Sequence, residues 1–349
     1  MKGWPLRIAA IGAIAFFALT FVNASWLAPD PKGSVKLIAE HGLAQLPMPG
    51  PQAREECAAT RIEPPNHRWL DNTAEGARKA AQLGTQVIGA DLRLTADGQF
   101  VLFHDAQLDC RTNGSGRVQD MTLAELKALD MGHGYTPDGG KTFPFRGQGV
   151  GQIATLSEFL RALPPRTRVM YRMDDSSPEF AEKLAAALKE LGRDPVASRD
   201  SFYGFDAPVD KIRSLYPGIW AWSPRAAQQC ASDYKLYGWT GMLPDSCKGG
   251  TMLVTLDSQF FYWGWPNRLI ARMEEQGGQI IVAAGDGSMA DGGVTLPEQL
   301  GEVPSSFNGY LWVADPWIVT PALYSSRDFR TAEEQRAAIK ATEERRARQ

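Results

Sequence analysis

The sequence lacks an excess of charge of either sign. Its 349 residues include 37 basic and 40 acidic side chains, for a formal net charge of -3. A chain that wraps nucleic acid carries a basic surface, so we expect no nucleic-acid partner. Cysteine is scarce too, with four residues and no C-x-x-C spacing. These shortages and a 44% hydrophobic content exclude a disulfide scaffold, a collagen-like chain and a disordered chain.

Long uncharged runs are rare, and the one at residues 8–22 is shorter than the ~20 residues that comfortably span a bilayer. Lys2 and Arg7 precede it, and residues 22–24 offer short side chains where a signal peptidase would cut. A buried helix is the interpretation we favour least, and we expect residues 1–28 to be a signal peptide, with an N-terminal membrane anchor as the alternative. Either predicts an exported protein, periplasmic or otherwise extracytoplasmic, and the anchor would add membrane association.

The four cysteines are an even number, which in an oxidising compartment favours two disulfides. Of the three pairings, we favour Cys57 with Cys110 and Cys230 with Cys247, because the second pair brackets a Gly- and Pro-containing loop. The alternative is four buried, reduced cysteines, since free cysteine packs as a small hydrophobe.

Short apolar runs alternate with helical patterns from residue 34 to 325, which favours an α/β fold, a (β/α)8 TIM barrel, over an open doubly wound sheet. Two irregular stretches, the Pro-rich insertion 46–70 and the Gly-rich segment 132–151, are expected to form pocket walls. Residues 326–349 read as a charged, solvated helical tail. Strands are predicted at 35–39, 86–94, 99–104, 168–173, 201–205, 218–222, 252–256, 279–283 and 310–313, and helices at 73–83, 178–191, 209–216, 224–237 and 266–276.

The stretch 71–130 carries a dense set of motifs: Asp-Asn-Thr at 71–73, Thr-Ala-Asp-Gly at 95–98, His104-Asp105, and Thr-Leu-Ala-Glu-Leu at 122–126. It resembles the glycerophosphodiester phosphodiesterase family, in an exported bacterial branch. The resemblance implies a phospholipase-C-like TIM barrel that hydrolyses phospholipid-derived glycerophosphodiesters. It also implies two catalytic histidines and carboxylates that hold a divalent cation, Ca²⁺ or Mg²⁺, beside the phosphate.

Matched to that pattern, His104 is a catalytic histidine and Asp91 a metal ligand. The chain departs from the family elsewhere. The first strand ends in Glu40-His41-Gly42 where the family has His-Arg-Gly, and Gly89 stands where the family has a glutamate. The family ligand positions are therefore substituted, which puts the cation in doubt.

Two mechanisms fit these residues. In the first, Glu40 and Asp91 form a rebuilt cation site, His104 is the general acid and His41 the base. In the second, no metal binds: Arg93 or Arg172 neutralises the phosphate, and His41 and His104 move protons.

Two further function classes stay open. One is a catalytically degenerate barrel that binds a phosphorylated ligand or a protein partner. The other is a glycosidase with Glu40 and Asp91 as its carboxylate pair. Residues 260–266 are consecutive aromatic and small residues. We expect them to pack inside the protein, the alternative being a ligand wall or interfacial patch. His67 and His133 are expected to be solvated.

Overall fold

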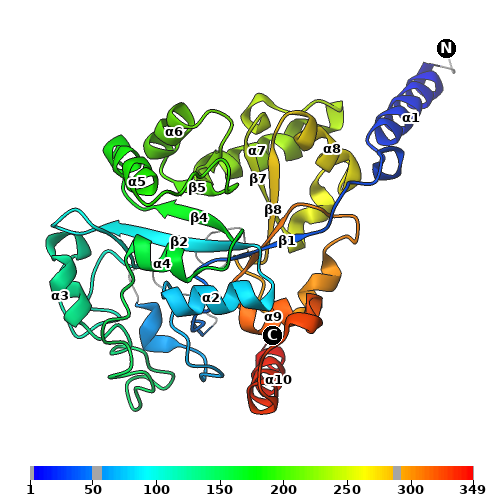
Figure 1. Ribbon diagram of the computed structural model, residues 1–349. Helices are drawn as coiled ribbons and strands as arrows, with labels where there is room; N and C mark the ends of the chain where they lie inside the picture. Colours follow the sequence, from blue (N-terminus) through cyan, green and yellow to red (C-terminus); the bar gives the residue numbers. More distant parts are fainter. Residues whose placement is uncertain (1–3, 49–56, 286–291, 349) are drawn as a thin grey trace. The chain divides into compact units, whose positions relative to one another are not determined.

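The computed structural model describes residues 4–48, 57–285 and 292–348 (Figure 1). Lys2 and part of the predicted insertion, residues 49–56, lie outside the described residues. The chain divides into two compact units. The first, here called the site unit, comprises residues 37–221, 293–298 and 313–349, and the second comprises residues 1–36, 222–292 and 299–312.

The order of elements is that of the predicted barrel, with strands and helices alternating along the chain. The strands are β1 (Lys36–Ala39), β2 (Val87–Leu94), β3 (Phe100–Leu102), β4 (Arg168–Met173), β5 (Ser201–Gly204), β6 (Trp220–Trp222), β7 (Thr251–Thr255), β8 (Gln279–Ala283) and β9 (Tyr310–Val313). The helices are α1 (Trp4–Val22), α2 (Ala74–Leu83), α3 (Leu123–Ala128), α4 (Leu156–Ala162), α5 (Pro178–Glu190), α6 (Asp206–Leu215), α7 (Pro224–Tyr237), α8 (Asn267–Glu275), α9 (Pro316–Leu323) and α10 (Ala332–Arg346).

Short 3₁₀ helices occupy several connections: η1 (Ser25–Leu27), η2 (Ala58–Arg61), η3 (Val118–Asp120), η4 (Gly238–Thr240), η5 (Asp245–Cys247), η6 (Leu256–Phe261), η7 (Pro297–Glu302) and η8 (Ser325–Arg327). The predicted strand at 99–104 is shorter than expected. The strand found there, β3, pairs with β2 in the antiparallel direction, and the other described strand pairs are parallel.

In the site unit β2 pairs in parallel with β1 and β4, and β4 pairs in parallel with β5. These strands are buried on both faces, as parallel strands covered by helices are. Helix α2 follows the cap Thr73, whose side chain accepts a hydrogen bond from Gly76 N (3.1 Å), and its apolar face enters the core. Helices α2 and α4 pack side by side beside β2 (Figure 1). The predicted TIM-barrel class is confirmed by this strand and helix order and by the parallel pairing.

In the second unit β8 pairs in parallel with β7 and β9. Helix α1 contacts this unit at its carboxyl end, where Asn23 Nδ2 donates to Trp239 O (2.8 Å). Its apolar side chains are largely exposed, with Phe17 at 69%. Within the described residues, we find no helix with the length and apolar character needed to cross a membrane.

Both favoured disulfides are present. Cys57 pairs with Cys110, and Cys230 pairs with Cys247. The first joins the middle of the insertion, just before η2, to the loop after β3, and the second joins α7 to η5. The alternative of four reduced cysteines is therefore wrong for this structure.

Three minor expectations need correction. The C-terminal tail is not simply solvated, because Arg345 is buried and pairs with Glu63 (2.7 Å) and Asp315 (3.0 Å). His67 is not solvated, because Gln45 hydrogen-bonds to its ring (3.1 Å) and burial lowers its pKa to about 4. In the aromatic run Tyr262 is buried as expected, but the side chain of Phe260 is 83% exposed.

Candidate active site

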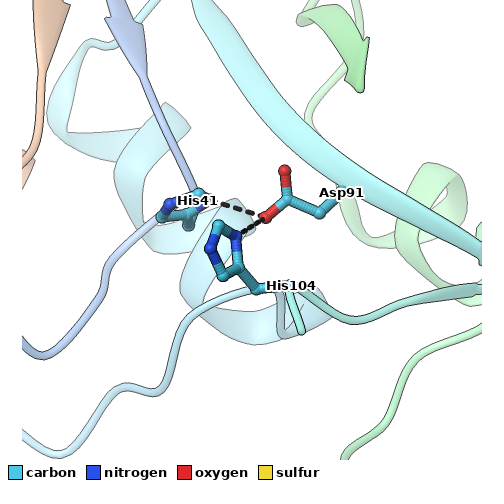
Figure 2. Close-up of side chains that lie close together, drawn as sticks. All are labelled: His41, Asp91 and His104. Atoms are coloured by element: carbon cyan, nitrogen blue, oxygen red, sulfur yellow. Dashed lines mark hydrogen bonds and ion pairs between the residues drawn. The ribbon is translucent and has the colours of Figure 1, made fainter. Parts of the chain in front are cut away.

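Three side chains from separate segments of the site unit meet at one point (Figure 2). His41 follows the end of β1, Asp91 lies within β2, and His104 follows β3. Nδ1 of His41 lies 2.8 Å from Asp91 Oδ2, and Nδ1 of His104 lies 2.9 Å from the same oxygen. One carboxylate oxygen therefore holds both imidazoles.

The carboxylate of Asp91 is anionic. Its side chain is 1% exposed, and burial alone would raise its pKa, but the facing charges of His41 and His104 outweigh that effect and hold the pKa well below its usual range. Oδ1 has no hydrogen-bond partner in the described part of the chain. A glycosidase needs two carboxyl groups that reach the sugar substrate. The buried carboxylate of Asp91 does not meet this need, which argues against the glycosidase class.

His41 lies between two carboxylates. Its Nε2 is 3.5 Å from Glu40 Oε1, on the side opposite Asp91. Burial lowers the pKa of His41, but the charges of Asp91 and Glu40 exceed that effect and raise it to about 9. His41 is therefore an imidazolium at neutral pH.

The parallel register places a row of three side chains across neighbouring strands. Asp91 of β2 is opposite Arg172 of β4, and Arg172 is opposite Tyr203 of β5. Arg172 Nη1 lies 3.7 Å from Asp91 Oδ1 and 3.1 Å from His104 Nδ1. Its side chain is 29% exposed, and the carboxylate of Asp91 raises its pKa against the opposing effect of burial. A guanidinium beside the imidazole of His104 is suited to binding an anionic ligand.

Arg93 has a different environment. It donates to the backbone oxygen of His104 (2.7 Å) and is paired with Asp174. Burial lowers the pKa of Arg93 despite Asp174, and its side chain is 14% exposed. Arg93 therefore holds the backbone at His104, whereas Arg172 presents the more accessible guanidinium.

A buried ionic cluster supports the segments that carry the site. Arg111 Nη1 donates to both oxygens of Asp71 (2.9 and 2.8 Å), and its Nε donates to Asp105 Oδ2 (2.5 Å). Tyr135 also donates to Asp71. Burial would raise the pKa of Asp71, but the Arg111 charge outweighs it and the pKa is lowered. Arg111 thus ties the residue after His104 to the loop before α2.

Position 89 has no room for a side chain. A Cβ there would lie 1.8 Å from Glu40 O. The carboxylate that the family resemblance implies at this position is therefore sterically excluded unless β1 moves.

The donor set does not fit the expected Ca²⁺ or Mg²⁺. His41, Asp91 and His104 offer ligand atoms within 4.8 Å of one another, one carboxylate oxygen and two imidazole nitrogens. Both hard cations prefer several oxygen ligands, about six to eight for Ca²⁺. Arg172 also lies 3.1 Å from one of the nitrogens, where it would repel a cation. The group is a possible site for a divalent ion, with chemistry closer to that of nitrogen-preferring metals.

Most predicted site residues lie together: His41, Asp91, His104, Arg93 and Arg172 form one cluster, with Glu40 against His41. Two neighbours of this cluster, Tyr203 and Asn72, were not predicted from the sequence. No local motif marks Tyr203, and its place opposite Arg172 follows only from the pairing register of β4 and β5. Asn72 belongs to the Asp-Asn-Thr motif that reads as a helix cap, but only Thr73 caps α2, and Asn72 contacts Asp91.

Residues 65–207 match the model of the glycerophosphoryl diester phosphodiesterase family. A glycerophosphodiester phosphodiesterase of Caldanaerobacter subterraneus subsp. tengcongensis is 36% identical over 157 residues, 42% of this chain and 61% of that protein. One from Bacillus subtilis is 29% identical over 171 residues, 46% of this chain and 57% of that protein. The chain thus spans about six tenths of the length of these curated relatives.

Solved structures extend the likeness over more of the chain. A glycerophosphodiester phosphodiesterase from Agrobacterium tumefaciens has a TM-score of 0.56 at 21% identity, covering 84% of this chain and 99% of that one. An Oleispira antarctica phosphodiesterase in complex with the product sn-glycerol-3-phosphate has a TM-score of 0.52 at 18% identity, covering 87% and 98%. At these identities the likeness shows the fold.

Proposed function

We propose that the chain is a member of the glycerophosphoryl diester phosphodiesterase family, whose model matches residues 65–207, and that it hydrolyses glycerophosphodiesters, releasing glycerol 3-phosphate and an alcohol. The observation that carries this proposal is the pair of imidazoles on one buried carboxylate, with the guanidinium of Arg172 beside them. A phosphodiester is an anion, so its hydrolysis needs charge neutralisation and two proton transfers. We propose a small-molecule substrate, and the net charge of -3 is the basis for expecting no nucleic-acid partner.

The two histidines differ in environment and therefore in role. His104 directs Nδ1 at Asp91, and its side chain is 31% exposed, so its other nitrogen, Nε2, is the one left to face a substrate. In that orientation it takes a proton from the attacking water as the P–O bond forms. His41, held as an imidazolium by Asp91 and Glu40, gives a proton to the leaving alkoxide as the second P–O bond breaks. The mechanism with a cation site, described under the sequence analysis, has the opposite roles, with His104 as the general acid and His41 as the base.

Arg172 supplies the positive charge that steadies the phosphate. Its side chain is more exposed than that of Arg93, and it is not tied to a backbone oxygen in the described contacts. Because the donor set does not suit Ca²⁺ or Mg²⁺, no step is assigned to either ion. We therefore propose the metal-independent mechanism, in which the guanidinium of Arg172 supplies the charge beside the imidazole of His104.

The decisive experiment is the release of glycerol 3-phosphate from purified glycerophosphodiesters with choline, ethanolamine and glycerol headgroups. We expect turnover that survives a chelator, is lost in His104→Ala and is kept in His133→Ala, a loop histidine outside the cluster. Turnover that requires Ca²⁺ or Mg²⁺ would overturn the metal-independent part. No turnover with any diester, together with measurable binding of glycerol 3-phosphate, would favour the degenerate binding protein instead.

We also propose that the protein is exported. Two disulfides suit an oxidising compartment, and residues 8–22 are uncharged. Fusing residues 1–28 to a reporter that is active only outside the cytoplasm should give activity, and sequencing the mature amino terminus should show cleavage near residue 24. Cytoplasmic retention of the fusion would contradict export. An uncleaved terminus that sediments with membranes would establish the anchor and membrane association.

A further inference from the structure

Asn72 contacts two parts of the site at once. Its Nδ2 donates to Asp91 Oδ2 (2.8 Å), and its Oδ1 accepts from Asp91 N (3.1 Å). Its own backbone N donates to His41 O (3.0 Å). The side-chain amide of Asn72 therefore hydrogen-bonds to both the backbone and the carboxylate of Asp91, and the backbone of Asn72 hydrogen-bonds to the backbone of His41.

The backbone of Asn72 has a φ of 56°, in the left-handed region. Asparagine tolerates this region better than most residues other than glycine. The side chain is 1% exposed, and the next residue, Thr73, supplies the cap of α2. Helix capping therefore does not explain the burial of the Asn72 amide, whereas its two hydrogen bonds to Asp91 do.

We propose that Asn72 is a positioning residue for phosphodiester hydrolysis: it fixes the rotation of the Asp91 carboxylate so that Oδ2 faces both imidazoles and Oδ1 faces Arg172. This inference rests on the proposed function. A carboxylate free to rotate would not hold Nδ1 of His104, and Nε2 would lose its orientation toward substrate. Removing the amide should therefore slow the chemical step while Arg172 still binds the phosphate.

The substitution Asn72→Gly tests the role of the side-chain amide most directly. Glycine adopts a φ of 56° without steric cost, so the variant removes the amide and keeps the backbone. Loss of a residue that orients a site residue typically costs about 10- to 100-fold in activity, and we expect that loss in kcat with KM within about threefold. Arg166→Gly is the matched control, since Arg166 is exposed, has a φ of 70° and lies outside the cluster.

Asn72→Asp separates positioning from space filling. Aspartate keeps the size and the acceptor of asparagine but replaces the Nδ2 donor with an oxygen that faces Asp91. A space-filling role predicts near-normal kcat for this variant. Positioning predicts a loss at least as large as in Asn72→Gly.

A measurement without turnover distinguishes a failure of this inference from a failure of the proposed function. The chain has four histidines, so imidazole nitrogen and proton NMR signals can be assigned individually. We expect the Nδ1 environments of His41 and His104 to change in Asn72→Gly and to stay unchanged in Arg166→Gly. Unchanged signals, or an Asn72→Gly enzyme with normal kcat, would overturn the positioning role. A wild-type protein inactive on every diester would instead refute the proposed function, and the NMR signals would still decide the inference.

Discussion

The rings of His41 and His104 lie edge to face, with centroids 4.8 Å apart and planes inclined at 71°. Both point Nδ1 at the same oxygen of Asp91 (Figure 2). The two imidazoles have different surroundings, because in the described part of the chain His41 alone has a second carboxylate, Glu40, near its other nitrogen. This asymmetry separates a proton donor from a proton acceptor.

Asp91→Asn should lower kcat by about 10²- to 10⁴-fold, the range typical of a lost proton-transfer arrangement. The substitution keeps the size of the side chain but removes the charge that favours the imidazolium of His41. Steady-state kinetics and NMR titration of His41 measure both effects, and the pKa of His41 should fall. A fully active Asp91→Asn variant would contradict the proton-transfer scheme.

The stability contributed by His41 should depend on pH. Its pKa is raised from 6.5 to about 9 in the folded state, so the stabilisation is fully present below pH 6.5 and is lost as the pH rises through 9. The difference in unfolding free energy between wild type and His41→Asn should therefore shrink, by on the order of 1–3 kcal/mol, between pH 6 and pH 9.5. Urea denaturation at the two pH values measures it. A difference independent of pH would show that His41 is not held as an imidazolium.

Arg172→Ala should lower kcat/KM by about 10²- to 10³-fold, as loss of one group that stabilises transition-state charge does. Arg172→Lys should recover only part of this activity, because an ammonium group lacks the two-pronged geometry of guanidinium. Arg161→Ala, in the exposed part of α4, is the control. Equal activity of the Arg172 and Arg161 variants would remove Arg172 from the site.

The disulfide Cys57–Cys110 should support activity as well as stability. It closes a separation of 53 residues, worth about 4 kcal/mol in the chain-entropy account, and Cys110 precedes Arg111, which holds Asp71 and Asp105. A double Cys→Ser variant should therefore melt earlier and have a lower kcat. The same change at Cys230 and Cys247, in the other unit, should lower stability only. Identical kinetic effects of the two variants would argue against a role for the first disulfide at the site.

Arg345→Ala should destabilise the protein by about 3–5 kcal/mol, because it removes the arginine that pairs with the buried carboxylate of Asp315 and one of the two arginines that pair with Glu63. Arg336→Ala, on the exposed face of the same helix, should be close to neutral. Thermal and chemical unfolding of the two variants compare them. Equal stability of the two variants would mean that the ion pair between Arg345 of the tail and Glu63 of the insertion does not stabilise the fold.

Local patterns were sufficient for the strands and for most of the longer helices, and they pointed to candidate residues that the structure brings together, but they did not predict α4 and α9. Alternation of apolar runs predicted the barrel class, and the motif around His104-Asp105 predicted a catalytic histidine near Asp91, because strand spacing and short motifs are written in neighbouring residues. The same reasoning predicted both disulfides. It misread the tail and His67, because Arg345 is buried against Glu63, which is hundreds of residues away, and the ring of His67 bonds to Gln45, which is tens of residues away.

The sequence alone determined the resemblance to the phosphodiesterase family, the order of strands and the residues available for chemistry, since these depend on short motifs and short-range spacing. Only the tertiary structure decided which of them meet. The register of β2, β4 and β5 aligned Asp91, Arg172 and Tyr203, and the close approach of Glu40 O to Gly89 excluded a second carboxylate there. The sequence places Asn72 in a helix-capping motif, whereas the structure shows that its amide hydrogen-bonds to Asp91. The sequence could not predict this contact, because the distances between side chains of separate segments are set by strand pairing and packing.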